Sequence, residues 1–192
     1  MHTLIFATNN EHKIKEIQSL VSIDFNIITL KAAGIDIDIP EPHPSLKENA
    51  YEKAITIAHL SSQNCFSEDT GLEIEALQGE PGVKSARYAG EERNFQANID
   101  KVLEKLKGQT NRKAQFRTVI CLIWNNEIFY FEGICKGHIA MTMQGEEGFG
   151  YDPIFIPEGA QKSFAQMSMD EKNSYSHRQK AVTQLFTFLN SI

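Results

Sequence analysis

Cysteine is scarce in this chain: its 192 residues include three, Cys65, Cys121 and Cys135. The number is odd and no two lie close together, so neither a disulfide framework nor a thiolate zinc site is expected. A reducing compartment fits this usage, and the expected location is cytoplasmic. Apolar runs stay shorter than the ~18–20 residues that span a bilayer, and the N-terminus lacks the basic segment of a signal peptide. No membrane partner is therefore expected.

Basic residues are also fewer than acidic ones. The chain has 19 lysines and arginines against 25 acids, which gives a net charge of −6. A non-specific nucleic-acid binder carries a basic field, so no nucleic-acid partner is expected, although a local basic site for a small phosphate ligand is compatible with this composition. The loop GxxxxGK[ST] and the fingerprint GxGxxG are both missing, which disfavours P-loop NTPases and Rossmann dehydrogenases.

The length, with 41% hydrophobic and 23% charged residues, predicts one soluble domain over residues 1–192, or two small lobes that share one core. Its beginning reads as a βαβ unit: a strand at 3–7, a helix from 11 to 21 and a strand near 25–30. Asn10 is the expected N-cap of that helix. A second helix is predicted over 46–61.

Turn signals divide the middle of the chain. Ser45 and Glu48 form a capping-box pattern before the second helix. A buried strand near 64–68 is expected to end at Asp69-Thr70-Gly71, with another strand over 72–77. Later predicted elements are a helix at 92–107, a hairpin of 114–124 and 127–135 turning at Asn125-Asn126, a short strand at 153–156 and a helix from 177 to about 190. This order predicts an α/β fold with a mixed sheet.

Two lysines occupy unusual helical positions. Lys53 falls inside the apolar stripe of the second helix, formed by Leu46, Ala50, Ala54, Ile57 and Leu60. It either extends its ammonium to solvent or points into a cleft beside the core. Lys13 lies in the first turn of its helix, where a bound anion would favour a cation. The alternative for Lys13 is a solvated surface side chain.

Acidic residues gather where the middle strand is expected to end. Glu68 and Asp69 lie there, and Glu41 lies in a proline-flanked loop. Carboxylates together with phosphate oxygens suit Mg²⁺, which takes few protein ligands. The competing interpretation is a solvated turn in which Asp69 makes a local cap.

Two further segments carry chemistry near the end of the chain. Phe149-Gly150-Tyr151-Asp152 follows a glycine-rich stretch, and aromatic side chains there can stack on a planar base or return to the core. His177 and Arg178 begin the last predicted helix, with Lys172 just upstream. This group can supply a further anion or base contact, although each residue alone is a weak signal.

Six motifs occur in a fixed order: Thr8-Asn9-Asn10-Glu11-His12-Lys13; Glu48-Asn49-Ala50 with Lys53; Ser67-Glu68-Asp69-Thr70-Gly71-Leu72; the run from Pro81 to Gly90; Phe149-Gly150-Tyr151-Asp152; and Glu171-Lys172-Asn173 followed by Ser176-His177-Arg178. With these motifs the chain resembles the inosine/xanthosine triphosphate pyrophosphatase family over nearly its whole length. Asn9 departs from the glycine of many relatives, and the loop around Glu41 departs from their Glu-Thr-Gly.

The resemblance implies an elongated mixed β-sheet with flanking helices that form two lobes around a central cleft. It implies a homodimer that requires Mg²⁺ and hydrolyses deaminated purine nucleoside triphosphates (dITP, ITP, XTP and dXTP) between the α and β phosphates. Asp69 would then activate water and bind the metal together with Glu41. Substrate contacts would come from Thr8, Asn9, Asn10, Glu11, His12, Lys13, Lys53, Thr70, Phe149, Gly150, Tyr151, Asp152, Lys172, His177 and Arg178.

Donors at His177 and Arg178 would favour the 6-oxo group of hypoxanthine and xanthine over the 6-amino group of adenine. Two alternatives remain. One is a pyrophosphatase of the same fold that acts on modified pyrimidine nucleotides. The other is a purine nucleotide sensor without catalysis, although a sensor has no need of a water-activating carboxylate.

Overall fold

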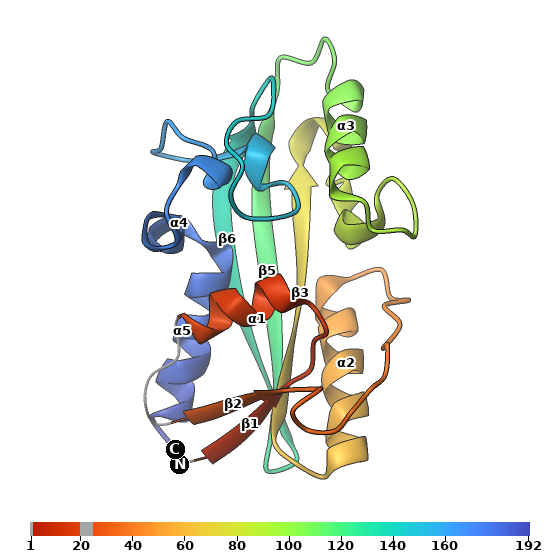
Figure 1. Cartoon of the computed structure of the whole chain (residues 1–192), viewed down its shortest axis with the longest axis vertical. Coiled ribbons are helices and arrows are strands. Elements are labelled where there is room, and N and C mark those ends of the chain that lie inside the picture. The colour runs from red at the N-terminus through yellow and green to blue at the C-terminus, as the bar shows by residue number, and fades with distance from the viewer. Residues whose placement is uncertain (1, 20–24) are drawn as a thin grey trace. The chain divides into compact units, whose positions relative to one another are not determined.

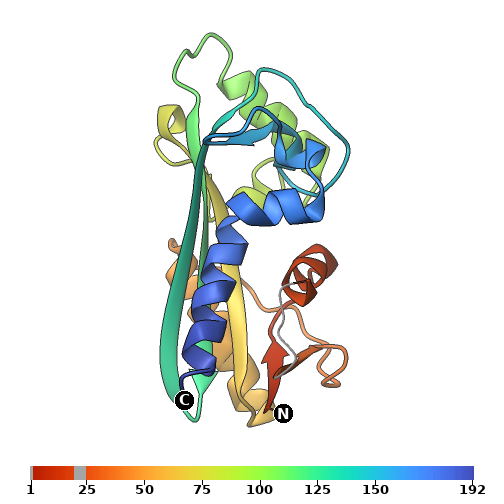
Figure 2. The same ribbon diagram turned by 90° about the vertical axis from the view of Figure 1, so that its left-hand side faces the viewer.

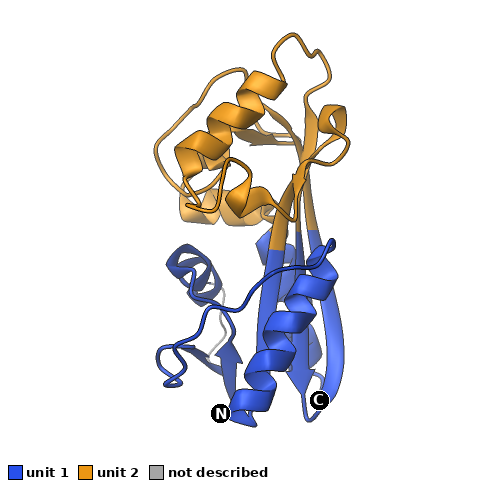
Figure 3. Ribbon diagram, turned by 90° about the vertical axis from the view of Figure 1, so that its right-hand side faces the viewer, with its two compact units in different colours: residues 1–69, 118–133, 178–192 blue, residues 70–117, 134–177 orange. Residues whose placement is uncertain are grey.

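The computed structural model describes residues 2–19 and 25–192. Its main elements are β1 (His2–Phe6), α1 (Glu11–Gln18), β2 (Phe25–Thr29), α2 (Leu46–Ser61), β3 (Cys65–Ile74), β4 (Pro81–Gly82), α3 (Phe95–Lys105), β5 (Lys113–Trp124), β6 (Glu127–Ile139), β7 (Phe155–Pro157), α4 (Met169–Tyr175) and α5 (His177–Leu189). The chain divides into two compact units (Figure 3). Unit 1 comprises residues 1–69, 118–133 and 178–192, and unit 2 comprises residues 70–117 and 134–177.

The described strands form one seven-stranded sheet in the order β2-β1-β3-β5-β6-β7, with β4 pairing to β3. β1 is parallel to both β2 and β3, whereas β4 and β7 pair antiparallel to their neighbours. The predicted α/β class with a mixed sheet is therefore confirmed. No helix in the described part of the chain combines the length and apolar character that a bilayer crossing requires.

Unit 1 has three layers (Figures 1 and 2). Because side chains alternate along a strand, Leu4 and Phe6 of β1 pack with α1 and α5, while Ile5 packs with α2 on the opposite face. The same alternation places Phe66 of β3 with α1 and α5, and Cys65 with α2. Each helix in unit 1 thus covers a defined face of the strands.

The predicted helix starts of unit 1 are confirmed. Asn10 caps α1 by accepting from the backbone N–H groups of His12 and Lys13, and Ser45 caps α2 by accepting from that of Glu48. The last two positions of the predicted 11–21 helix lie outside the described residues. Leu60 was expected in the apolar stripe of α2, but it is 61% exposed because the stripe leaves the core near the end of the helix.

The turn predicted at Asp69-Thr70-Gly71 is wrong: β3 runs unbroken from Cys65 to Ile74. The glycine has another cause, since a Cβ on Gly71 would lie 2.6 Å from the carbonyl oxygen of Gly82 in the paired strand β4. Close approach of two backbones, rather than a turn, requires glycine at this position. The solvated-turn interpretation of Glu68 and Asp69 is also wrong, because both residues are buried.

Unit 2 has its own core, one apolar cluster that includes Val102 of α3, Leu72 of β3, Phe116 of β5 and Cys135 of β6. The predicted hairpin between β5 and β6 is confirmed, with Asn125 and Asn126 both at positive φ. α4 was not expected from the sequence. Ser168 begins this helix by accepting from the backbone N–H of Glu171, and the following seven residues carry Lys172.

Candidate active site

Within unit 1, the strand β1 ends beside the first residues of its neighbour β3, which continues past it. Phe6, the last residue of β1, pairs with Phe66, so Glu68 and Asp69 lie beyond the carboxyl end of β1. The segment from Thr8 to Asn10 leaves β1 at the same edge and leads into α1. Ligands of open α/β sheets bind beyond the carboxyl ends of the strands. The strand end that matters here belongs to β1 and not to β3.

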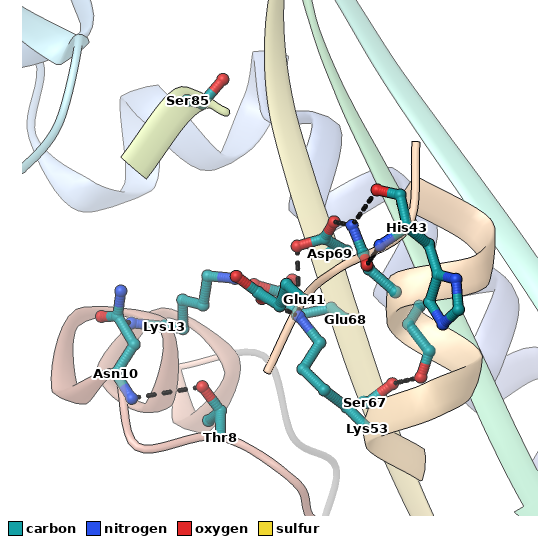
Figure 4. Close-up of polar contacts among 12 residues, drawn as sticks. Thr8, Asn10, Lys13, Glu41, His43, Lys53, Ser67, Glu68, Asp69 and Ser85 are labelled. Carbon is teal, nitrogen blue, oxygen red and sulfur yellow. Dashed lines mark hydrogen bonds and ion pairs between the residues drawn. The ribbon is translucent and has the colours of Figure 1, made fainter. Parts of the chain in front are cut away.

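Asp69 and Glu41 share one ammonium group (Figure 4). Nζ of Lys53 lies 3.1 Å from Oδ1 of Asp69 and 2.5 Å from Oε1 of Glu41. Burial raises the pKa of the Asp69 carboxyl, although Lys53 pulls it the other way. For Lys53, burial would lower the pKa, but the two carboxylates together raise it. Lys53 is therefore buried and charged, and it does not extend to solvent.

Glu68 has different partners from Asp69. Its carboxylate accepts from Nε of Arg178 at 2.9 Å and lies 3.1 Å from Nζ of Lys13. Arg178 also donates through Nη1 to Glu16 of α1. Burial would raise the pKa of Glu68, but Arg178 and Lys13 outweigh it and lower the pKa to about 2. Glu68 is thus fixed as an anion within a buried network of two cations and two carboxylates.

The Thr8–Lys13 segment is held by its own side chains. Oγ1 of Thr8 accepts from the backbone N–H of Asn10, which in turn caps α1. Asn9 donates from its side chain to the carbonyl oxygen of Ile37 at 2.8 Å, a bond that glycine could not make. Glu11 and His12 are exposed, whereas Lys13 points toward the carboxylates (Figure 4).

Unit 2 brings together the aromatic motif and Lys172. Oδ2 of Asp152 accepts from the backbone N–H of Phe149 at 2.8 Å and from Nζ of the buried Lys172 at 2.7 Å. That ammonium lies 5.3 Å from the centre of the Phe149 ring. A Cβ on Gly148 would lie 2.1 Å from Oδ2 of Asp152, so only glycine fits beside this carboxylate.

Two other predicted residues of unit 2, Tyr151 and His177, make contacts within the protein. The hydroxyl of Tyr151 donates to the carbonyl oxygen of Ser85 at 2.8 Å and is buried. His177 stacks on Phe116, with ring centroids 4.7 Å apart and planes inclined by 13°. Gly150 has positive φ, and Thr70 is the first residue of unit 2 on β3.

His177 and Arg178 were treated as one pair in the sequence, but their described contacts separate them. His177 packs on Phe116 in unit 2, and Arg178 bonds the carboxylates of Glu16 and Glu68 in unit 1. Adjacent residues at a helix start project in different directions, since each step turns by about 100°. A direct contact of Arg178 with a base stays a prediction.

Sequence reasoning gave no role to two buried residues of unit 1. Glu16 was not singled out, although it lies one turn after Lys13 on α1. Asn49 appeared only as part of a motif, yet its side chain lies 3.4 Å from Oδ2 of Asp69. In both cases the available signal was a polar residue at a helical position that faces the core.

A divalent cation would find two carboxylates at this place. Glu41 and Asp69 converge on the position of one cationic nitrogen. No group of three or more histidine, cysteine, aspartate or glutamate side chains in residues 2–19 and 25–192 is arranged to hold a metal. A metal bound by Glu41 and Asp69 would thus need further oxygens from water or from a ligand, which is the coordination that Mg²⁺ prefers.

Comparison with known proteins gives consistent matches along the chain. The model of the Ham1 family matches residues 4–188. A dITP/XTP pyrophosphatase of Flavobacterium psychrophilum is 50% identical over 188 residues, covering 98% of this chain and 99% of that protein. A protein of the same name from Porphyromonas gingivalis is 50% identical over 190 residues, with 98% of each chain covered.

Solved structures agree. The Ham1 protein of Staphylococcus aureus matches with a TM-score of 0.90 at 39% identity, over 98% of both chains. A HAM1 protein from Coxiella burnetii matches with a TM-score of 0.92 at 35% identity, over 100% of both chains. Sequence and structure thus match along nearly the full length, and the chain belongs to the Ham1 family.

Proposed function

We propose that the protein is a dITP/XTP pyrophosphatase that hydrolyses deaminated purine nucleoside triphosphates to the monophosphate and pyrophosphate. The names of relatives with 50% identity support this activity. The observation that carries the proposal is the trio of Asp69, Lys53 and Glu41. At the carboxyl end of β1, the ammonium group of Lys53 lies no more than 3.1 Å from an oxygen of the buried Asp69 carboxylate and from one of Glu41.

Recognition of the triphosphate needs positive charge, because this group carries about four negative charges. Lys13 and Lys53 supply it from α1 and α2. The N-terminus of α1, which follows Thr8, adds partial positive charge from the helix dipole. Asn9 positions this loop through its bond to Ile37.

The cation proposed for this site is Mg²⁺, with Glu41 and Asp69 as its ligands. Glu41 is favoured over Glu68 because Glu41 and Asp69 both contact Nζ of Lys53, whereas Glu68 contacts other cations, Arg178 and Lys13. When bound, Mg²⁺ supplies charge neutralisation for phosphate oxygens and lowers the pKa of water. Two carboxylates suit this ion, which takes few protein ligands and completes its coordination with oxygens of water and substrate.

Asp69 is proposed to accept the proton of the attacking water. The water oxygen forms a bond to the α phosphorus, the bond from that phosphorus to the bridging oxygen breaks, and pyrophosphate leaves. Because its pKa is raised, Asp69 is a stronger base than an ordinary aspartate and accepts a proton more readily. Lys53 keeps Oδ1 of Asp69 oriented and offsets negative charge that develops on the phosphates.

Base selection is proposed to reside in unit 2. Phe149 offers a ring for stacking, with the Lys172 and Asp152 pair beside it. Lys172 and His177 can donate to a 6-oxo group, which adenine lacks. If Arg178 also reads the base, Arg178→Ala will lower the ratio of kcat/KM for dITP to that for dATP. An equal loss with both nucleotides would refute that role.

The deciding experiment is incubation of the purified protein with Mg²⁺ and each of ITP, dITP, XTP, ATP, GTP and dTTP. Chromatography should show monophosphate and pyrophosphate, made mainly from the deaminated purines. Preference for pyrimidine nucleotides would favour the pyrimidine alternative, and tight ITP binding without turnover would favour the sensor. Diphosphate with orthophosphate would mean that the wrong bond is cleaved.

The resemblance also implies an assembly and a place of action. We propose a homodimer acting on the cytoplasmic nucleotide pool. The free state of the three cysteines fits a reducing compartment. Light scattering coupled to size exclusion tests the assembly, and one chain mass in solution would refute it.

A further inference from the structure

Asn49 contacts both carboxylate-bearing segments of the candidate active site from one position on α2. It is fully buried, at 0% exposure, and lies one helical turn before Lys53. Its Nδ2 donates to the carbonyl oxygen of His43 at 3.1 Å and to Oδ2 of Asp69 at 3.4 Å. Its Oδ1 accepts from the backbone N–H of His43 at 2.9 Å. These contacts use both hydrogens of the amide and its oxygen.

The neighbours of Asn49 fix the orientation of its amide. The backbone N–H of His43 can only donate, so it requires the amide oxygen. The carbonyl oxygen of His43 and the carboxylate of Asp69 accept from the amide nitrogen. Exchange of oxygen and nitrogen would break all three contacts, and Asn49 therefore has one orientation here.

These bonds join two parts of the chain that are distant in sequence. His43 lies two residues after Glu41, so a clamp on both polar groups of the His43 backbone restrains the loop that presents Glu41. At the same time, Asn49 and Lys53 hold the two carboxylate oxygens of Asp69, one each. The separation of the two carboxylates is thus set from one face of α2.

We propose that Asn49 is a positioning residue that holds Glu41 and Asp69 at the separation needed to bind a divalent cation with the nucleotide. This inference rests on the proposed function. Asn49 acts through the two carboxylates, by its bond to Asp69 and by its two bonds to the His43 backbone beside Glu41. Outer contacts that orient metal ligands contribute roughly 10–100-fold to metal affinity in proteins.

A purely structural role for Asn49 would predict a different result, and the chain offers a matched control. Asn98 of α3 is also buried, at 2% exposure. Its amide accepts from the backbone N–H of Ala89 at 2.7 Å and donates to the carbonyl oxygen of Ala86 at 3.0 Å. It clamps a loop as Asn49 does, but none of its three side-chain bonds goes to a carboxylate.

The experiment compares the dissociation constant of inosine 5′-(α,β-methylene)triphosphate with Mn²⁺ and with EDTA. The ratio of the two constants is the metal-dependent gain in affinity, measured by calorimetry without turnover. Asn49→Ala is expected to lower this gain at least tenfold, while Asn98→Ala leaves it within twofold of wild type. Thermal melting monitored by circular dichroism reports the loss of stability in each variant.

Some results would contradict the role of Asn49, and others would contradict the proposed function. A gain in Asn49→Ala within twofold of wild type would overturn the role of Asn49, and so would an equal fall in both variants. If Asn49→Ala does not fold, Asn49→Ser takes its place under the same criteria. A wild-type protein with no metal-dependent gain and no hydrolysis of dITP would instead refute the proposed function.

Discussion

Glu68 and Asp69 are neighbours in β3, yet their carboxylates pair with cations from opposite faces of the sheet. Glu68 lies on the same face of β3 as Phe66, and its carboxylate pairs with Lys13 of α1 and Arg178 of α5. Asp69 lies on the same face of β3 as Cys65, and its carboxylate pairs with Lys53 of α2. One strand thereby gives a low pKa to one carboxylate and a raised pKa to the next. The two acids are suited to different tasks.

Replacement of the proposed base should abolish turnover without unfolding the protein. Asp69→Asn keeps the shape of the side chain but cannot accept a proton, so kcat for dITP should fall by roughly 10²–10⁴-fold. Binding of the methylene analogue should persist in part. Steady-state kinetics and calorimetry measure the two effects. Asp100→Asn, an exposed acid on α3, is the control, and a similar fall there would contradict the assignment.

The pKa of Asp69 can be measured directly in the metal-free protein. Burial should place it above the ordinary 3.8, so the carboxylate should take up a proton at a higher pH than a free aspartate. Lys53→Met removes an opposing charge and should raise this pKa further. Carbon-13 NMR of the labelled carboxyl group follows the titration. A midpoint below 3.8 in the wild type would contradict the prediction.

Glu68 should make stability depend on pH. Its pKa is lowered in the folded state from 4.5 to about 2, so its stabilising effect is complete above about pH 5 and disappears as pH falls toward 2. The shift corresponds to about 3 kcal/mol. The free energy of unfolding of the wild type minus that of Glu68→Gln should shrink by about this amount across that window. Urea denaturation at several pH values measures it, and a constant difference would disprove the prediction.

Arg178→Ala should destabilise the fold. It leaves the carboxylates of Glu16 and Glu68 buried without their guanidinium partner, which costs roughly 3–5 kcal/mol in comparable buried pairs. Arg117→Ala is the control, because that side chain is 39% exposed and lies 3.7 Å from Glu73. Its cost should stay below about 1 kcal/mol. Equal losses in denaturant unfolding would argue against the buried network.

Phe149→Ala tests the stacking platform of unit 2. Loss of one stacked ring should weaken nucleotide binding by about 1–3 kcal/mol, seen as a higher KM for dITP with a smaller effect on kcat. Tyr130→Ala, an aromatic of unit 1 with 38% exposure, should change neither constant by more than about twofold. A loss in kcat alone would show that Phe149 does not bind the base.

Local signals in the sequence were sufficient for much of the fold. The caps at Asn10 and Ser45 depend on residues within three positions, and both predictions are confirmed. The helical period placed Lys53 inside the apolar stripe of α2, but it left open whether the side chain extends to solvent or points into a cleft. The family resemblance, drawn from six motifs, is confirmed by the match over residues 4–188.

Contacts between distant residues escaped prediction. Arg178 lies 110 positions from Glu68 and 162 positions from Glu16, and no local pattern names those partners. Asp69-Thr70-Gly71 has the composition of a turn, yet glycine is required at position 71 because the backbone of Gly82 in the neighbouring strand lies too close for a side chain. The short helix α4 has only seven residues, too few to display an apolar period.

The ion pairs of unit 1 have a consequence for electroneutrality. Four carboxylates, those of Glu16, Glu41, Glu68 and Asp69, meet three cations, Lys13, Lys53 and Arg178. With all seven ionised, the cluster carries one excess negative charge. If Mg²⁺ binds as proposed, its two positive charges turn this excess of −1 into +1, a sign that suits a bound triphosphate.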